Sequence, residues 1–319
     1  MTAGIIIENI LQALLTGLLV GSVYGLLCVG LGMIFSVMRV INFAQGEFMM
    51  IGMYAALFCF QALGFGSALG VWLGLIASAL AAGAILYAVG ALLHPALLAR
   101  VTGTRVAGSE GDGHYPQLTL TLGLSLLLAN GGLIVFGSSP HTIQTDLSSS
   151  AWTIGPLMGE DVLLFLNKAR VLTFGVTLAV AVCVALFITR TRTGKILRAS
   201  ADNALAALYM GIDVTRAHRL AFALGAAITG IAGGLLAASY PFQPYVGVEF
   251  VVIMYAGVVL GGMGSIRGAF WGGLTIGLVQ QMSSLVLPMQ LQGAAIFGMF
   301  LLVMLCRPQG LFGRVTDRA

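Results

Sequence analysis

Four polar side chains interrupt the apolar first third of the sequence within residues 38–54 (MRVINFAQGEFMMIGMY), namely Arg39, Asn42, Gln45 and Glu47. A carboxylate or guanidinium at the depth of a bilayer's hydrocarbon costs about 2.5–3.5 kcal/mol, so such groups face a wet cavity, pair with each other, or lie near a helix end. We expect Asn42, Gln45 and Glu47 to lie at a translocation path. The competing interpretation is that Glu47 ends a helix at the membrane interface and pairs with Arg39.

The sequence spacing of Asn42, Gln45 and Glu47 determines whether their side chains can lie close together on a helix. If residues 42–47 are helical, Asn42 and Gln45 are three residues apart and share a face. Asn42 and Glu47 are five apart, so a helix break at Gly46 would help all three side chains converge.

A second polar set lies in the apolar run 118–132, LTLTLGLSLLLANGG. Hydroxyl groups in lipid often bond their own helix or a neighbouring one. Thr121, Ser125 and Asn130 are therefore candidates for lining the same path, with helix packing as the alternative.

Composition places these residues in a membrane protein. The 319-residue chain is 59% hydrophobic and only 8% charged, with a mean hydropathy of +1.01, whereas soluble domains carry about 25% charged residues. The net charge of +4 does not indicate nucleic-acid binding, because the basic residues are spread over the ends of apolar runs. We expect a polytopic, all-α protein surrounded by lipid.

Nine apolar runs predict nine spans, at residues 10–37, 45–62, 68–93, 117–136, 171–189, 217–240, 249–263, 268–287 and 290–306. The first run has 28 residues, about 42 Å of helix against a hydrocarbon core of about 30 Å. It must tilt strongly or break. Gly30 and Gly32 are the predicted break points, and a break would give ten spans.

Basic residues predict the orientation. Residues 189–220 hold six of the fifteen Lys and Arg residues: Arg190, Arg192, Lys195, Arg198, Arg216 and Arg219. Basic loops lie on the cytoplasmic side, which makes 190–216 a cytoplasmic loop and 137–170 a periplasmic one. The tail, with Arg307, Arg314 and Arg318, and the loop with Arg100 and Arg105 then fall on the cytoplasmic side.

The segment 191–220 also predicts a short amphipathic helix outside the bilayer. Alanine and leucine between 199 and 208 favour a helix, and Gly211 stands where a C-terminal glycine would end it. Such a helix is either a docking surface for a cytosolic partner or a spacer between two spans.

Glycines at every fourth position predict close helix packing. They form two ladders, Gly17, Gly21 and Gly25 in the first run and Gly264, Gly268 and Gly272 in the run 257–277. The second ladder predicts a hairpin whose backbone turns near residues 265–267.

The sequence does not indicate an enzyme. No GxxxxGK[ST] phosphate loop, HExxH metal motif or GxSxG elbow is present, and the four cysteines have no CxxC spacing. We therefore expect no cofactor or metal in this chain, and no hydrolysis of nucleotide by it alone.

Four stretches carry a family resemblance: INFAQGEFMMIG (41–52), TLGLSL (121–126), RTRTGKILRASADNALAALYMGID (190–213) and VLGGMGSIRGAFWGG (259–273). They resemble the permease subunits of branched-chain amino acid ABC importers, of the LivH type. The resemblance covers nearly the whole chain in the right order, as a single permease domain 1–319.

The resemblance implies a multi-pass protein of the bacterial inner membrane that pairs with a LivM-type permease. It implies two ATPase subunits of the LivG and LivF type, which bind ATP and Mg, and a periplasmic or lipid-anchored binding protein that delivers the solute. It further implies that 190–213 contains a coupling helix resting on an ATPase. Candidate coupling residues are Lys195, Arg198, Ala199, Asp202, Ala206, Met210 and Gly211.

Two departures from the family pattern leave the solute open. The family often has His where this chain has Gln45, and its branched-chain members tend to have Lys where this chain has Ile253. Related systems carry urea, short amides, or aromatic and aliphatic carboxylates. A stand-alone channel or secondary transporter also fits the composition but needs no docking helix, and a non-transporting scaffold needs no buried polar groups.

Overall fold

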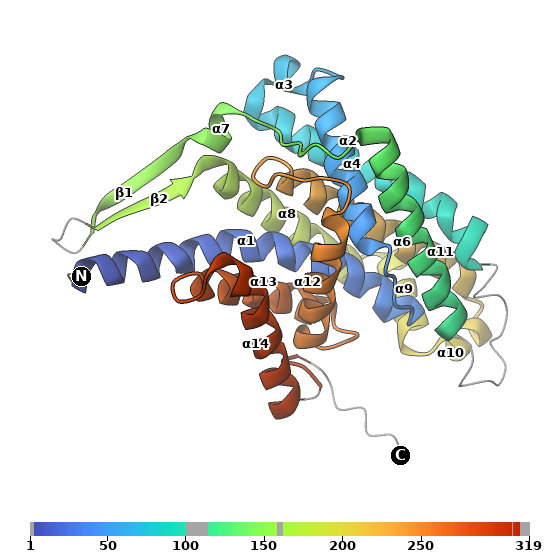
Figure 1. The fold of residues 1–319 in the computed structure, drawn as a ribbon. Coiled ribbons are helices and arrows are strands. Elements are labelled where there is room, and N and C mark those ends of the chain that lie inside the picture. The colour runs from blue at the N-terminus through green and yellow to red at the C-terminus, as the bar shows by residue number, and fades with distance from the viewer. Residues whose placement is uncertain (1–2, 100–113, 158–161, 308, 313–319) are drawn as a thin grey trace.

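A computed structural model describes residues 3–99, 114–157, 162–307 and 309–312 (Figure 1). Nine helices of at least 15 residues in these ranges occupy the nine apolar runs: α1 (Ala3–Met38), α2 (Gln45–Gln61), α4 (Gly70–Leu93), α6 (His114–Phe136), α8 (Lys168–Arg190), α11 (Val214–Leu236), α12 (Val246–Gly261), α13 (Ile266–Ser283) and α14 (Gln292–Cys306). Five are long and apolar enough to cross a bilayer, and α12 and α14 are shorter apolar helices. The predicted polytopic helical fold is confirmed.

Shorter elements connect these helices: α3 (Phe65–Ala68), the π-helix η1 (His94–Leu98), α7 (Asp146–Ser149), α9 (Arg192–Asp202), α10 (Ala204–Tyr209) and the 3₁₀ turn η2 (Met289–Leu291). Four of the basic residues on which the predicted orientation in the membrane rests lie outside the described residues: Arg100, Arg105, Arg314 and Arg318.

Helix α1 is continuous over 36 residues, so the predicted break at Gly30 or Gly32 is wrong. Both glycines serve close packing instead. A Cβ on Gly30 would lie 2.9 Å from the carbonyl oxygen of Gly225 in α11, and one on Gly32 would lie 3.0 Å from the Ala269 side chain in α13. At about 54 Å the helix exceeds a core of about 30 Å, which requires a strong tilt.

Glycines bring α1 and α13 into backbone contact. A Cβ on Gly21 would lie 2.6 Å from the carbonyl oxygen of Leu274, and one on Gly25 would lie 2.7 Å from that of Phe270. Gly17 packs on Leu278 in the same way. The contact is reciprocal, because a Cβ on Gly273 would lie 2.6 Å from the Tyr24 carbonyl carbon.

The second ladder divides into two roles. Gly268 and Gly272 lie against the backbone of α12, at Gly261 and Gly257. Gly264 has a φ of +98° and no atom within 4 Å of an added Cβ, so it serves the turn between α12 and α13 and not helix packing. Ser265 then caps α13 by accepting a hydrogen bond from the Gly268 N–H.

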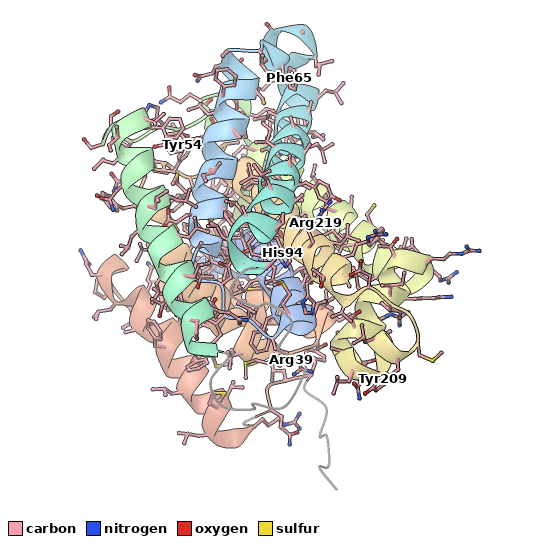
Figure 2. All side chains as sticks on the ribbon, turned by 90° about the vertical axis from the view of Figure 1, so that its right-hand side faces the viewer. Arg39, Tyr54, Phe65, His94, Tyr209 and Arg219 are labelled. Atoms are coloured by element: carbon pink, nitrogen blue, oxygen red, sulfur yellow. The ribbon has the colours of Figure 1, made fainter. Side chains whose placement is uncertain are left out.

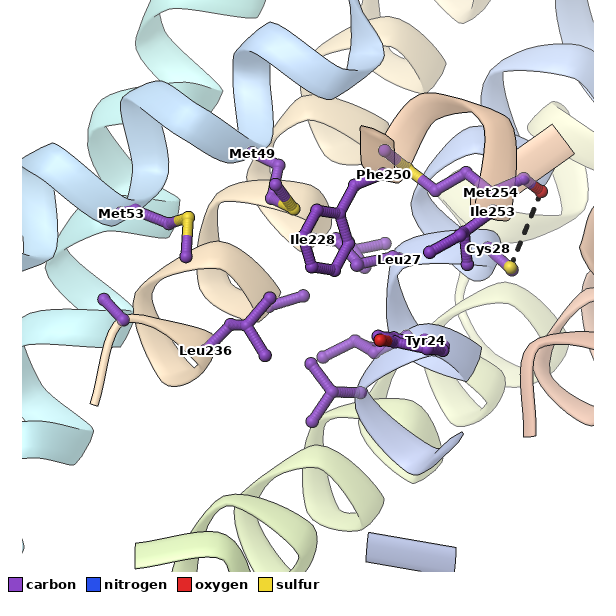
Figure 3. Packing of buried hydrophobic residues seen from close by; sticks show 14 of the residues in the cluster. Tyr24, Leu27, Cys28, Met49, Met53, Ile228, Leu236, Phe250, Ile253 and Met254 are labelled. Carbon is purple, nitrogen blue, oxygen red and sulfur yellow. Dashed lines mark hydrogen bonds between the residues drawn. The ribbon is translucent and has the colours of Figure 1, made fainter. Parts of the chain in front are cut away.

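The inner helices share one apolar core (Figure 3). Its members include Tyr24, Leu27 and Cys28 of α1, Met49 and Met53 of α2, Ile228 of α11, and Phe250 and Met254 of α12. The Cys28 thiol donates to the Met254 carbonyl at 3.6 Å. In the most apolar part of each span, 83% of α1 and 72% of α11 is buried, against 22% of α6 and 17% of α8. Helices α1 and α11 are therefore central, and α6 and α8 are peripheral.

A β-hairpin was not predicted. Strands β1 (Ala151–Leu157) and β2 (Val162–Asn167) pair antiparallel, with Trp152 opposite Leu166 and Ile154 opposite Leu164. The aromatic and β-branched side chains in these strands favour extended backbone. The hairpin was not predicted because these residues lie in the stretch 137–170, which was interpreted as a loop between two spans.

The predicted amphipathic helix is two helices, α9 and α10. Asn203, at φ −152°, leaves the helical region and accepts a hydrogen bond from the Ala206 N–H, which starts α10 anew. Gly211 follows α10 with a φ of +80°, so it ends the helical segment as the sequence predicts.

The α1–α13 contact makes a testable prediction. Gly21→Ala forces a Cβ against the Leu274 carbonyl, which should lower the free energy of unfolding by about 1–3 kcal/mol. Gly298→Ala in α14 is the control, because no atom of the described residues lies within 4 Å of its added Cβ and alanine favours helix by at most about 1 kcal/mol. Unfolding in mixed micelles measures both; equal stability of the two variants would contradict this contact.

Candidate translocation site

The polar stretch of the first third lies deep within the helix bundle. The Gln45 side-chain amide donates to the Gly225 carbonyl at 3.4 Å and to the Thr229 hydroxyl. Gly225 and Thr229 lie near the middle of α11, a 23-residue span. Helix α2 therefore begins at the depth of the membrane interior, and residues 39–44 return from the end of α1 to that depth.

Asn42 and Gln45 form a satisfied amide pair. The Asn42 amide nitrogen donates to Gln45 Oε1 at 2.9 Å, and Asn42 Oδ1 accepts from the Ala44 N–H at 3.2 Å. Asn42, Gln45 and Thr229 are all fully buried. The pair does not arise from a shared helical face, because Asn42 precedes α2. Instead, Asn42 lies in the turn before α2 and bonds to the side chain of Gln45, the first residue of that helix.

Glu47 is buried with one carboxylate oxygen unpartnered. Its side chain is 1% exposed, and its Oε1 accepts a hydrogen bond from Ser125 Oγ at 3.4 Å. Its Oε2 has no hydrogen-bond partner among the described residues. The carboxyl group packs on Gly247, where an added Cβ would lie 2.7 Å from each carboxylate oxygen.

Two helix N-termini meet at this carboxylate. Glu47 is in the first turn of α2 and Gly247 in the first turn of α12, and neither helix has a side-chain cap at its N-terminus. Uncapped N–H groups give each helix start a partial positive charge, which favours a nearby anion by up to about 2 kcal/mol when partly buried. The dipoles of α2 and α12 thus stabilise a carboxylate in the membrane interior.

Arg39 does not pair with Glu47. Its side chain is exposed, and its guanidinium donates to the Ala201 carbonyl, in the last turn of α9, at 3.5 Å. Its backbone is left-handed, with φ +55°, which turns the chain at the end of α1. The predicted alternative of an interfacial Arg39–Glu47 pair is wrong, because the two side chains bond to different elements.

The polar side chains of α6 extend the cluster. Thr121 donates to the Ile41 carbonyl at 3.2 Å, and Ser125 reaches Glu47 as described. Nearer the end of α6, Asn130 accepts from the Tyr245 hydroxyl at 3.4 Å, directly before α12. The fold thus brings Thr121 and Ser125 to the stretch 41–47, more than seventy residues away in the sequence. Asn130 is exposed and bonds to Tyr245, so it lies outside the buried cluster.

Sequence reasoning missed Thr229, Tyr245 and Gly247. Thr229 was the most accessible to prediction, since it is a polar residue in the apolar run AAITGIAGG. No sequence pattern around Tyr245 or Gly247 predicts their place in the site, because it depends on where α12 begins relative to α2.

A cavity of about 480 Å³ lies beside the turn between α1 and α2. It is lined by Phe35, Arg39, Ile41, Gln117 and Leu118. Ile41, whose carbonyl accepts from Thr121, directly precedes the buried Asn42. Because Asn42, Gln45 and Glu47 are at most 1% exposed, the polar cluster is closed in this conformation.

The α9–α10 segment projects from the end of the molecule where Arg39 lies, and Figure 2 shows Arg39 and Tyr209 together there, remote from Tyr54 and Phe65. Leu197 of α9 packs with Val37, Ala217 and Ala221. Of the candidate coupling residues, Ala199 is half-buried, and Lys195, Arg198, Asp202, Ala206, Met210 and Gly211 are exposed.

These features define a multi-pass membrane protein with a closed polar cluster between helices and an exposed helical segment at one end. The sequence profile of a family described as "Branched-chain amino acid transport system / permease component" matches residues 13–305. The chain belongs to this family of transport permeases.

Relatives match over nearly the full length. The chain is 31% identical over 311 residues to the high-affinity branched-chain amino acid transport system permease protein BraD of Pseudomonas aeruginosa, covering 97% of each chain. It is 31% identical over 306 residues to LivH, the corresponding permease of Escherichia coli K12, covering 95% of this chain and 96% of the relative. A probable LivH of Methanocaldococcus jannaschii is 26% identical over 257 residues, 81% of this chain and 76% of that one. No solved structure matches the chain.

Family membership makes the chain a subunit of an ABC transport system and not an enzyme. Permeases of this family work without a cofactor of their own. Such a system includes separate ATPase subunits and, in general, a solute-binding protein.

The Gln45–Thr229 bond can be tested by its stability contribution. Thr229→Val keeps the side-chain shape but removes the hydroxyl that accepts from Gln45, so the free energy of unfolding should fall by about 1–3 kcal/mol. Thr177→Val in α8 is the matched control, because Thr177 is also fully buried but its hydroxyl has no partner among the residues that the structure describes. A loss of equal size in both variants, measured by unfolding in mixed micelles, would show that the Thr229 bond does not stabilise the fold.

Proposed function

We propose that this chain is the permease subunit of an ATP-driven importer and forms the translocation path for branched-chain or other hydrophobic amino acids. The observation that carries the proposal is the Glu47 carboxylate, buried in the membrane interior with an oxygen that no described group satisfies. Intramembrane ionisable residues commonly mark solute pathways. The printed names of BraD and LivH support the amino acid substrate.

The cluster has the groups that a zwitterionic amino acid requires. Glu47 Oε2 is a hydrogen-bond acceptor for an ammonium group, and the uncapped N-termini of α2 and α12 are donors suited to a carboxylate. Urea or short amides would use the amides of Asn42 and Gln45 instead and have no need of a charged acceptor. The second candidate is an importer of those solutes or of aromatic and aliphatic carboxylates, because Gln45 and Ile253 depart from the family pattern. Binding measurements on the exported solute-binding protein distinguish these solutes from amino acids.

Access to the cluster depends on α6 in this proposal. Helix α6 covers Glu47 through Ser125 but is mostly exposed to its surroundings. A shift of α6 away from α2 breaks the bonds of Thr121 and Ser125, which opens the way from the Ile41 cavity to Glu47. Thr121, Ser125 and Asn130 then line the path with Asn42, Gln45 and Glu47.

The proposed assembly pairs this chain with a LivM-type permease, two ATPases of the LivG and LivF type, and a periplasmic or lipid-anchored binding protein. It resides in the bacterial inner membrane. The six basic residues of 189–220 favour a cytoplasmic position for α9 and α10, and in this proposed topology 137–170 is periplasmic and the C-terminus cytoplasmic. The segment 190–216 then couples the permease to an ATPase.

Glu47 gives the direct test. Glu47→Gln and Glu47→Ala should assemble with their partners but lose most solute uptake, because the acceptor for the solute is removed. Uptake of labelled amino acid into proteoliposomes containing the whole complex measures this. Asp146→Asn, an exposed carboxylate in α7, is the control and should transport normally.

Adding Arg39→Ala should not restore uptake to the Glu47 variants, since Arg39 bonds to α9 and not to Glu47. Wild-type uptake by Glu47→Ala, or rescue by the double variant, would assign Glu47 to architecture alone.

The coupling role of α9 and α10 has a separate test. Gly211→Val places a β-branched residue at φ +80°, a left-handed conformation that costs about 1–2 kcal/mol, and should distort the end of α10. Solute-stimulated ATP hydrolysis by the complex should fall while the amount of inserted permease stays normal. Gly211→Asn is the control, because asparagine tolerates that conformation. Charge reversal at Arg198 and Asp202 should have the same effect as valine; normal stimulation in these variants would make the segment a spacer.

A further inference from the structure

The β1–β2 hairpin exposes large apolar side chains on both faces. Trp152 and Ile154 lie on one face, 45% and 47% exposed, and Leu163 and Phe165 on the other, 41% and 49% exposed. None of its described side chains, Ala151–Gly155 and Leu163–Asn167, is charged. A hairpin with one face in water alternates apolar and polar residues, so water does not suit either face of this one.

The hairpin is fixed along the first half of α1. The Gln12 side chain donates to the Phe165 carbonyl at 2.7 Å and accepts from the Phe165 N–H at 3.0 Å, which satisfies the backbone of β2 at this residue. Figure 1 shows the hairpin extending beside the N-terminal turns of α1. Those turns expose Ile5, Ile6, Ile7 and Ile10, so the apolar surface continues from helix to hairpin.

Aromatic and basic groups set the depth of the hairpin. The Trp152 ring stacks on Trp72 at 6.2 Å, and the Lys168 ammonium lies 5.9 Å from the Trp152 ring. Trp72 is in the first turn of α4 and Lys168 is the first residue of α8, so both mark the beginning of a span. Tryptophan is enriched at the level of lipid headgroups, and lysine reaches toward them from helix ends.

We propose that the β1–β2 hairpin lies within the headgroup and upper acyl region of the bilayer and has phospholipid as its partner. Its apolar side chains contact acyl chains, and the outer edge of β1, which pairs with no strand in the described part of the chain, faces interfacial water. The hydrocarbon core does not suit it, since open strand edges do not occur there. A protein partner fits less well, because protein interfaces have a polar rim, whereas Thr153 and Asn167 are the polar side chains among the described residues of these strands. The proposal holds for either orientation of the chain and for any solute.

This position explains the length of α1. A hairpin held at the interface by Gln12 keeps the first turns of α1 at the same shallow depth. The helix then enters the bilayer obliquely, which accommodates its 36 residues within a core of about 30 Å.

Depth-dependent fluorescence quenching tests the proposal in the assembled transporter in nanodiscs. The chain has three tryptophans, so Trp72→Phe with Trp271→Phe leaves Trp152 as the only one of this chain. The same complex with Trp152→Phe added gives the fluorescence of the partner subunits, which is subtracted. A lipid nitroxide near the headgroup should quench Trp152 at least about twofold more than one at the end of the acyl chain, and aqueous iodide should quench it weakly. Trp271, left alone in a Trp72→Phe and Trp152→Phe chain, is the reference for an exposed ring inside the span α13.

A second reporter covers the opposite face of the hairpin and guards against a local disturbance from the lost Trp72 stack. Phe165→Trp in a chain without the native tryptophans should give the same shallow quenching. Strong quenching of both reporters by iodide alone would place the hairpin in water. Protection from both lipid nitroxides and iodide would mean that a protein covers it. Either result would overturn the proposal.

Discussion

The close approach of Gly46 and Gly247 is the constraint on which the polar cluster depends. A side chain at Gly46 would overlap the Gly247 carbonyl, and one at Gly247 would overlap the Glu47 carboxylate. Only glycine at both positions lets the first turns of α2 and α12 meet around that carboxylate. The helix dipoles then favour the charge that lipid would oppose.

Backbone contacts of the same kind hold the surrounding frame. Gly233 lies against the Met49 carbonyl, and Gly52 against Gly230, so α2 packs closely on α11. Helix α1 is fixed to α13 by its own ladder. Apolar burial between helices gives little driving force in lipid, and close backbone packing replaces it. A rigid inner bundle can therefore position a buried carboxylate while α6 and α8 remain peripheral.

The chain belongs to a family of transport permeases, and its buried cluster contains hydrogen-bonding groups suited to binding a solute. The groups gathered around Glu47 are acceptors and donors: two side-chain amides, three hydroxyls and two helix ends. They suit the reversible exchange of a solute's hydration shell for protein contacts. The exposed α9–α10 segment, bonded to the α1–α2 turn by Arg39, lies at the end of the molecule from which residues 39–44 lead to the cluster (Figure 2).

Composition, run length and glycine spacing predict the membrane class, the apolar helices, the α12–α13 turn and the polar residues of 42–47 and 121–130. These features do not predict that α1 stays unbroken, that Arg39 turns to α9, or that the chain between 151 and 167 contains a hairpin. Those outcomes depend on contacts between residues far apart in the chain: Gly30 with Gly225, Arg39 with Ala201, Gln12 with Phe165. Tertiary structure alone brought Glu47 to Gly247, because local pattern specifies which side chains are apolar but not the depth at which two helices begin.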